Sequence, residues 1–329
     1  MRAVVIDGND NITLDSMPVP TPGPGEVLIK PGATGMCGTD LHLLSGHYAP
    51  GEYPLVPGHE FAGTIAGVGA GVTGLSEGDL VAADPNISCG SCRLCTLGAP
   101  NLCDNVRAIG VNLPGSCAEF VIAPAAVTVR LADSLDAATG ALIEPLSCVL
   151  NATQRAPGWA GQIMVIVGAG CIGQLATAVA VHHGAAEVHV VEPHEKRRAQ
   201  ALALGAKSAV ADAGELGMAD AVDLVLDASG HLGAIAAAFP LLRKRGRFVQ
   251  MGVAHPDALL EVSPYGLYAK ELAYIGANSV GESFVPAAEL MVDLADALRP
   301  LITHTFPLDA YAAATAAMRS PDALKVQIA

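Results

Sequence analysis

The sequence predicts an α/β protein with two domains, a compact β-rich domain followed by a doubly wound parallel sheet. The chain of 329 residues exceeds what one hydrophobic core usually serves. The sequence pattern changes near residue 148, where short β-type runs give way to apolar strands that alternate with alanine-rich helical stretches. A glycine-rich turn joins a strand to a helix shortly after that point, as in sheets that bind nucleotides.

Residues 1–147 are expected to form the β-rich domain. Glycine and proline punctuate its short β-type runs, among them 26–30, 63–68 and 118–122. Such punctuation is typical of a compact, irregular β structure. The alternation of apolar strands and helical stretches that begins near residue 148 stops near the end of the chain, so residues 287–329 are expected to return to the first domain.

Residues 148–286 are expected to form the parallel-sheet domain. The strands are expected at 163–167, 188–192, 222–228 and 248–252, and the helices at 172–183, 195–204 and 231–242. Strands that alternate with helices in this way build a parallel sheet with crossover helices. The basic run Arg243-Lys244-Arg245 is interpreted as the solvated end of a helix.

Charge and hydropathy argue against nucleic acid and membrane partners. The formal net charge of −14 repels nucleic acid phosphate and anionic lipid. The uncharged window Trp159–Val181 is long enough to cross a bilayer, but its glycines indicate a buried strand, turn and helix. The segment Met1–Asp7 meets an acid too early for the apolar core of a signal peptide, so the protein is expected to be cytoplasmic.

The glycine-rich turn has the spacing G-x-G-x-x-G. Gly168 permits the tight turn, Gly170 lets the backbone approach a pyrophosphate, and Gly173 lets the helix pack on the sheet. Cys171 and Ile172 open that helix, whose N-terminus would face the phosphates. The turn therefore predicts a dinucleotide site.

An acid at the end of the next strand bears on the choice of dinucleotide. Glu192 would accept hydrogen bonds from the ribose hydroxyls of the adenosine half. A 2′-phosphate beside this carboxylate would meet like-charge repulsion, so NAD is expected rather than NADP. The basic run Lys196-Arg197-Arg198 lies close enough to soften that preference.

Four of the eight cysteines lie within one short segment. Cys89, Cys92, Cys95 and Cys103 follow the pattern C-x2-C-x2-C-x7-C, which can close a tetrahedral thiolate shell around a structural zinc ion. Iron–sulfur runs of similar start place the fourth cysteine after three residues and before proline. Without a secretion signal, clustered cysteines also hold metal more often than they form disulfides.

The remaining potential ligands are scattered. Cys37 stands in Gly-Met-Cys-Gly-Thr-Asp, His59 and Glu60 follow Pro-Gly, and Glu144 precedes proline. Singly, such residues are more often a packed histidine or a turn glutamate than ligands. These residues indicate a metal site only when they are considered together with the other motifs of the chain.

That joint pattern resembles the zinc-containing medium-chain alcohol dehydrogenases, and their polyol (sorbitol-type) branch in particular. It consists of the motif at 35–40, Gly-His-Glu at 58–60, the four-cysteine segment, Glu144-Pro145, the glycine-rich turn and Asp-Ala-Ser-Gly at 227–230. The resemblance implies a GroES-like domain, a Rossmann domain, and homo-oligomers that are dimers or tetramers. It also implies a catalytic zinc ion, besides the structural one, held by Cys37, His59 and either Glu60 or Glu144. Ethanol-oxidising relatives carry cysteine at the position of Glu144, so this carboxylate favours the polyol branch.

The resemblance also implies the reaction. Zinc acts as a Lewis acid on an alcohol while NAD accepts a hydride from the same carbon, giving a ketone or aldehyde. Thr39 is placed to take the alcohol proton and His42 to pass it to solvent, while Arg197 lies on the adenosine side. Without the resemblance, Thr39 would be interpreted as part of a helix cap with Asp40 and His42 as a surface residue.

The substrate is less well defined. The sorbitol-type pattern expects an aromatic residue where Leu43 stands and Phe-Arg-Tyr where Asn278-Ser279-Val280 stands. A cyclitol, sugar or amino-alcohol substrate, including threonine, is therefore as compatible as a linear polyol. Polar residues that would line such a pocket are His47, Asn112, Asn278 and Ser279. Two further classes of protein stay open: a zinc-free quinone reductase, which would lack these ligands, and a non-catalytic NAD-binding sensor or structural protein.

Overall fold

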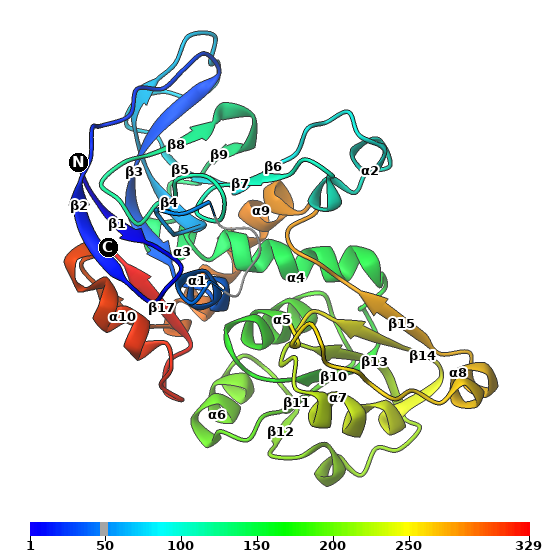
Figure 1. Ribbon diagram of the computed structural model, residues 1–329. Coiled ribbons are helices and arrows are strands. Elements are labelled where there is room, and N and C mark those ends of the chain that lie inside the picture. Colours follow the sequence, from blue (N-terminus) through cyan, green and yellow to red (C-terminus); the bar gives the residue numbers. More distant parts are fainter. Residues whose placement is uncertain (47–51) are drawn as a thin grey trace. The chain divides into compact units, whose positions relative to one another are not determined.

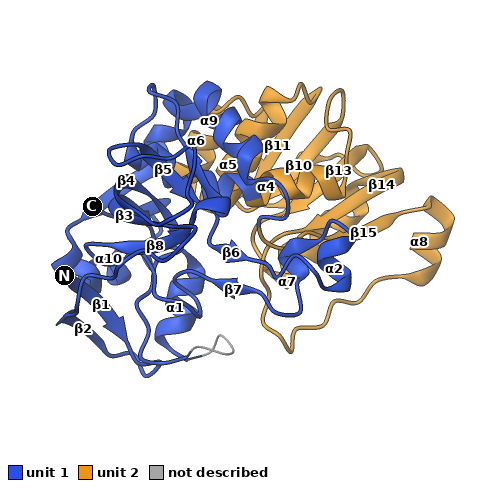
Figure 2. Cartoon of the chain, turned by 90° about the horizontal axis from the view of Figure 1, so that it is seen from above, with its two compact units in different colours: residues 1–147, 280–329 blue, residues 148–279 orange. Residues whose placement is uncertain are grey.

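The computed structural model describes residues 1–46 and 52–329, and contacts divide the chain into two compact units. Unit 1 comprises residues 1–147 and 280–329, and unit 2 comprises residues 148–279 (Figure 2). The chain re-enters unit 1 at Val280 rather than at the expected residue 287. Burial explains this difference, because Val280 and Phe284, at the start of helix α9, already pack inside unit 1.

Unit 1 is built around a seven-stranded sheet with the order β16-β17-β3-β4-β5-β9, in which β8 also pairs with β3. Strands β1 and β2, and strands β6 and β7, form two further two-stranded sheets. The strands of unit 1 are β1 Arg2–Ile6, β2 Ile12–Ser16, β3 Glu26–Gly35, β4 Glu60–Val68, β5 Leu80–Ala83, β6 Asn86–Ile87, β7 Arg107–Ala108, β8 Val121–Pro124, β9 Thr128–Arg130, β16 Ile302–Phe306 and β17 Lys325–Ile328. Its helices are α1 Gly38–Leu44, α2 Arg93–Thr96, α3 Ala137–Gly140, α9 Phe284–Leu298 and α10 Tyr311–Ala317, and α4 Ile143–Arg155 begins in this unit.

The register of this sheet brings distant segments together. Strand β17 pairs antiparallel with the end of β3, so that Gln327 lies opposite Gly35. Gly35 in turn lies opposite Glu60 at the start of β4. Alternate residues of β3 and β4, such as Ile29 and Phe61, fill the core beneath the sheet. Residues near 35, 60 and 325 consequently lie on three adjacent strands.

Unit 2 is the predicted doubly wound parallel sheet, and this prediction is confirmed. Its strands, all parallel, have the order β12-β11-β10-β13-β14-β15. They are β10 Ile163–Val167, β11 Glu187–Val191, β12 Ser208–Val210, β13 Val222–Asp227, β14 Leu242–Gln250 and β15 Ala273–Gly276. Its helices are α5 Cys171–His182, α6 Glu195–Ala203, α7 Leu232–Ala238 and α8 Pro264–Lys270 (Figure 1). The strand order reverses between β10 and β13, where sheets of this kind bind nucleotides.

The interpretation of Arg243-Lys244-Arg245 as a helix end is wrong. Helix α7 ends at Ala238, and Pro240 in the next turn prevents its continuation. The basic run lies instead at the exposed start of strand β14. Pairing of Leu242 with Val222 and an ion pair between Arg243 and Asp223 keep it extended.

The uncharged window at 159–181 is divided between strand β10 and helix α5, as its glycines predict. Among the residues that the structure describes, no helix combines the length and apolarity needed to cross a membrane.

Candidate functional site

Three potential metal ligands of different chemistry meet in unit 1. One ligand atom each from Cys37, His59 and Glu60 lies within 4.8 Å of the other two. Cys37 is the residue before the first turn of α1, and His59 and Glu60 lie at the start of β4. His59 and Glu60 are 6% and 2% exposed. The fold therefore assembles a partly exposed thiol, a buried imidazole and a buried carboxylate from segments that are over twenty residues apart, and this donor set suits zinc.

Asp40 links two of these ligands. Its Oδ2 accepts a hydrogen bond from the Cys37 backbone N–H at 2.8 Å, which caps the start of α1. Its Oδ1 lies 3.6 Å from His59 Nδ1, and neither of these two buried atoms has another partner among the described residues. Asp40 thus faces one ring nitrogen of His59 and leaves the other for a metal, the usual arrangement around histidine ligands.

The electrostatic field of this cluster favours a cation. Burial lowers the pKa of His59, but the charge of Asp40 and the neighbouring Cys37 raise it by more, so that it lies well above its usual range. A proton on His59 and a metal ion at the site would satisfy the same negative surroundings. The residues present therefore fit a divalent metal.

Glu144 lies in the first turn of α4 and is 9% exposed. It is not one of the three residues whose ligand atoms cluster within 4.8 Å. Burial and the nearby charge of Glu60 raise its pKa to about 7. The two glutamates are therefore electrostatic neighbours, and Glu60 is the one gathered with Cys37 and His59.

The two residues expected to move a proton lie on helix α1. Thr39 Oγ1 lies 3.7 Å from Cys37 Sγ, beside the ligand cluster. The cap of α1 is made by Asp40, so Thr39 is not needed for it. His42 lies in the last turn of α1 and is exposed to solvent.

The four-cysteine segment forms a second donor cluster in unit 1. Figure 1 shows this loop, with α2, extending from β6 and β7. The sulfur atoms all lie within 4.8 Å of one another and belong to Cys89, Cys92, Cys95 and Cys103. All eight cysteines of the chain are described, and none of them forms a disulfide.

Backbone amides and neighbouring thiols shape the chemistry of this loop. The backbone N–H groups of Cys89 and Asn105 donate to Cys103 Sγ at 3.3 Å, and that of Cys92 donates to Cys89 Sγ at 3.3 Å. Hydrogen bonds from Ser91 and Cys92 lower the pKa of Cys89 to about 6, whereas burial and adjacent thiols raise that of Cys95 to about 11. All four thiols can ionise together only beside a cation, so this donor set also fits zinc.

The glycine-rich turn in unit 2 has the predicted geometry. Gly168 has φ +90°, and a Cβ at Gly173 would come within 1.8 Å of the Gly168 carbonyl oxygen. A Cβ at Gly170 would meet nothing within 4 Å, so the backbone there faces open space. No side chain caps helix α5, which begins at Cys171 and Ile172. Its first N–H groups are thus available for phosphate oxygens.

Glu192 is fixed beside this turn. Its Oε2 accepts from the Ala169 N–H at 2.8 Å and its Oε1 from the His194 N–H at 3.0 Å, and the residue is 4% exposed. Arg197 lies partly exposed in α6, and its carbonyl oxygen accepts from Gln174 Nε2. Backbone contacts therefore hold the acid of the predicted nucleotide site in one place.

Leu43, which stands where the sorbitol-type pattern has an aromatic residue, is fully buried in the core of unit 1. Of the polar residues expected to line the substrate pocket, Asn112 uses its side chain within the fold. Asn112 Oδ1 accepts from the Ala108 N–H at 2.7 Å and so stabilises a turn. The carbonyl oxygens of Asn278 and Ser279 accept from Asn151 Nδ2. His47 lies outside the described residues.

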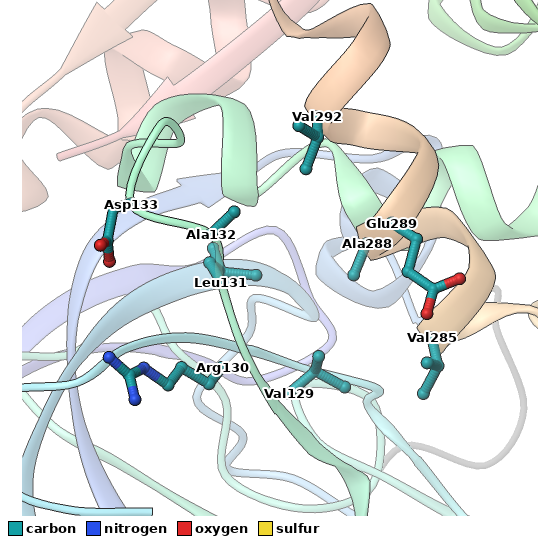
Figure 3. A pocket seen from close by; sticks show the side chains of 9 residues that line it. All are labelled: Val129, Arg130, Leu131, Ala132, Asp133, Val285, Ala288, Glu289 and Val292. Carbon is teal, nitrogen blue, oxygen red and sulfur yellow. The ribbon is translucent and has the colours of Figure 1, made fainter.

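A surface groove of about 520 Å³ in unit 1 contains none of the predicted site residues (Figure 3). It lies between α9 and the segment that follows β9, and it is lined by Val129, Arg130, Leu131, Ala132, Asp133, Val285, Ala288, Glu289 and Val292. Its lining is mainly aliphatic and offers no cluster of potential metal ligands. The candidate site is therefore the ligand cluster rather than this groove.

Sequence reasoning missed two residues that contact the cluster, Asp40 and Lys325. Lys325, the first residue of β17, is 3% exposed, and its Nζ lies 2.5 Å from Glu60 Oε2. The available signal for Lys325 was a lysine in a β-type run that carries no other charge, Lys-Val-Gln-Ile.

Comparison with protein families gives two matches along the chain. Residues 23–133 match the alcohol dehydrogenase GroES-like domain, and residues 171–293 match the zinc-binding dehydrogenase domain. The first match covers much of unit 1 and the second covers most of unit 2. The predicted GroES-like and Rossmann domains are thereby confirmed.

Characterised relatives span nearly the whole chain. D-altritol 5-dehydrogenase of Agrobacterium fabrum is 33% identical over 94% of this chain and 93% of its own length. Sorbitol dehydrogenase of Halalkalibacterium halodurans is 33% identical over 97% and 96%. L-threonine 3-dehydrogenase of Escherichia coli K12 is 32% identical over 98% and 97%. Threonine dehydrogenases are thus no better a match than the polyol dehydrogenases.

Solved structures agree with this assignment. A zinc-binding dehydrogenase from Sinorhizobium meliloti 1021, bound to NADP, has a TM-score of 0.94 and 31% identity over 99% of this chain and 98% of its own. An alcohol dehydrogenase from Escherichia coli CFT073, complexed with NADH, has a TM-score of 0.91 and 28% identity over 100% and 98%. The chain belongs to the zinc-dependent medium-chain alcohol and polyol dehydrogenases, oxidoreductases that use zinc and a nicotinamide cofactor.

Proposed function

We propose that this protein oxidises a secondary hydroxyl group of a polyol or a similar polyhydroxylated substrate to a ketone and passes the hydride to NAD. The observation that carries the proposal is the cluster of Cys37, His59 and Glu60, whose ligand atoms lie within 4.8 Å of one another. Relatives that act on altritol and sorbitol support a polyol substrate. Glu144, the carboxylate typical of the polyol branch, lies buried beside Glu60.

Each protein group has a separate task in this reaction. Zinc held by Cys37, His59 and Glu60 would supply a Lewis acid that makes the substrate hydroxyl more acidic. Thr39 Oγ1, 3.7 Å from Cys37 Sγ, is positioned to relay the hydroxyl proton, accepting it from the substrate as its own proton passes on towards His42. His42, exposed at the end of α1, would release that proton to solvent. Asp40 keeps His59 oriented through the Nδ1 side of its ring.

The preference for NAD is also part of the proposal. The carboxylate of Glu192 is held by two backbone amides and has little room to move aside for a 2′-phosphate. Repulsion between the Glu192 carboxylate and the 2′-phosphate would weaken NADP binding. We expect kcat/KM to be at least about tenfold higher with NAD, and the variant Glu192→Ala to lose most of that difference. Equal use of both cofactors by the wild type would contradict the assignment.

We further propose two zinc ions per chain, the second in the four-cysteine loop. Four thiolates complete a tetrahedral shell and leave no position for substrate, so this ion would be structural. Elemental analysis of protein purified without chelator should give two zinc ions per chain. One ion, retained by a variant that lacks Cys37, would indicate that the reaction site does not bind zinc.

A substrate panel tests the central proposal. NAD reduction by zinc-replete protein would be measured with linear polyols, cyclitols, sugars, amino alcohols, threonine and simple alcohols. Turnover of a polyol with vicinal hydroxyl groups is expected. Turnover of threonine alone, or of simple alcohols alone, would replace the polyol assignment.

We also propose that the protein acts as a homo-oligomer. Strand β15 is an edge strand of the sheet in unit 2, and Tyr274 on it is 46% exposed. Edge strands present backbone groups that can pair with a second chain. Light scattering after size exclusion should give the mass of a dimer or tetramer, and a monomer at micromolar concentration would contradict this.

A further inference from the structure

A buried lysine on the C-terminal strand contacts two ligand-bearing segments of unit 1. The Nζ of Lys325 lies 2.5 Å from Glu60 Oε2 and donates to the carbonyl oxygen of Met36 at 3.1 Å. The side chains of Lys325 and Glu60 are 4% and 2% exposed. Because Met36 directly precedes Cys37, one ammonium group touches the surroundings of both Cys37 and Glu60.

The strand register explains how this contact arises. Gly35 lies opposite Glu60 on β4, while β17 pairs with the other edge of β3 at Gly35. A Cβ at Gly35 would come within 2.2 Å of Glu60 Oε2. The Glu60 carboxylate therefore lies over Gly35, in space that any other residue would fill, and reaches across β3 to Lys325.

Stability alone is a poor reason for a buried ion pair at this place. Removing two charges from water costs about as much as, or more than, their attraction returns, and apolar replacements are often neutral or stabilising. This pair, however, holds a carboxylate that belongs to the ligand cluster. It also fixes the position of Glu60 Oε2, and with it the orientation of the whole carboxylate.

We propose that Lys325 is a positioning residue for the reaction metal, which fixes the Glu60 carboxylate and the backbone before Cys37 relative to one another. The inference rests on the proposed function, because it takes Cys37, His59 and Glu60 as the ligands. It also separates the two glutamates, since Lys325 holds Glu60 in the cluster whereas Glu144 lies outside it.

Three variants test this role in the full-length protein. Lys325→Met removes the ammonium group and keeps an extended side chain, whereas Lys325→Arg retains the charge. Lys30→Met is the matched control, because Lys30 is an exposed lysine on β3 of the same sheet. The readouts are zinc content, zinc affinity by chelator competition, and the visible spectrum after cobalt(II) replaces zinc in the Cys37 site.

Lys325→Met is expected to weaken metal binding at the Cys37 site by about 10- to 100-fold, the usual effect of losing a partner that orients a ligand. The cobalt spectrum should change as well, because the carboxylate ligand is no longer held, while the zinc of the four-cysteine loop is retained. Lys325→Arg should restore most of the affinity and the spectrum, and Lys30→Met should match the wild type.

Loss of the lysine leaves a buried carboxylate without its partner, which can prevent folding. The double variant Glu60→Gln/Lys325→Met removes both charges together, and it is compared with Glu60→Gln, in which the amide oxygen can still accept a hydrogen bond from Lys325. If Lys325 acts through Glu60, replacing it in the Glu60→Gln background should change metal affinity by no more than about twofold. An effect as large as in the wild-type background would overturn the proposal.

The two proposals fail in different ways. Unchanged zinc affinity and cobalt spectrum in Lys325→Met, with alcohol oxidation by the wild type, would overturn the role of Lys325 and leave the proposed function. The expected metal effects in a wild type that oxidises none of the alcohols would overturn the proposed function and leave the role of Lys325. Equal losses in Lys325→Met and Lys30→Met would show that the effect is not specific to this contact.

Discussion

The two donor clusters of unit 1 are assembled in opposite ways. The four-cysteine loop takes all its ligands from residues 89–103, and its sulfur atoms are held by backbone amides of the same loop. The cluster of Cys37, His59 and Glu60 takes its ligands from two segments, and Lys325 contacts it from a third. A local motif thus suffices to gather the four thiols, whereas the surroundings of the Cys37 cluster depend on the register of the sheet.

The largest expected effect is a loss of activity on replacing a ligand of the Cys37 cluster, which replacement of a cysteine of the loop should not cause directly. Cys37→Ser should lower kcat/KM by about 1000-fold or more, because a Lewis acid contributes several kcal/mol to such a reaction. Its melting temperature should change little, since the four-cysteine loop is intact. Steady-state kinetics and calorimetry on the same preparation check this. Full activity in Cys37→Ser would show that Cys37 does not belong to the reaction site.

Cys103→Ser should have the opposite profile, with stability affected first. Cys103 is the buried member of the loop and accepts hydrogen bonds from Cys89 and Asn105. Loss of a structural metal is among the few single changes that cost about 3 kcal/mol or more. Chemical unfolding and zinc content measure this. A variant that retains wild-type stability after losing one zinc ion would contradict a structural role.

Asp40→Asn sharpens the comparison, because the four-cysteine loop has no equivalent of Asp40. The variant keeps a cap for α1 but removes the charge that faces His59 Nδ1. Metal affinity at the Cys37 site should fall by about 10- to 100-fold, with little change in the loop. Chelator competition distinguishes the two ions. Equal weakening of both would show a general loss of structure.

The smallest expected effect concerns Asp84, which lies between β5 and the strand that leads to the loop. Burial raises the pKa of Asp84 to about 6, although Asn86 donates two hydrogen bonds to it. A raised pKa means that this carboxyl group weakens the fold as pH rises from about 4 to 6. Asp84→Asn should therefore add about 1–2 kcal/mol to the free energy of unfolding at pH 8.

The same experiment has a built-in control. The advantage of Asp84→Asn should decline as pH falls from 6 towards 4, where the wild-type carboxyl group is protonated in the folded protein. Denaturant unfolding at several pH values measures it. An advantage that is constant over this range would show that the charge of Asp84 is not the cause.

Local spacing predicted much of the fold and half of the site. The strand and glycine turn at 163–173 and the four cysteines at 89–103 are encoded by neighbouring residues, and the structure has both as expected. Leu43, in contrast, is fully buried in the core of unit 1, and nothing in its local sequence indicates this. The basic run at 243–245 was misassigned because its pairing with β13 is a long-range property.

Lys325 could not have been assigned from the sequence for the same reason. Its contact with Glu60 spans 265 positions and exists only because β17 lies beside β3. A buried lysine requires a partner, but the identity of that partner follows from the sheet order. Cys37 and His59 were recognised by resemblance rather than by derivation, since neither residue on its own indicates a metal site.

The long separation between Glu60 and Lys325 has a consequence for a chain that is still being translated. All four cysteines of the loop are present once the ribosome has passed residue 103, so that loop can take up zinc early. The partner of Glu60 emerges only after the whole of residues 148–279 has been synthesised. If Lys325 positions Glu60 as proposed, the reaction site would reach its full metal affinity only after the nucleotide unit has been synthesised, and an interrupted chain could retain the four-cysteine loop without Lys325.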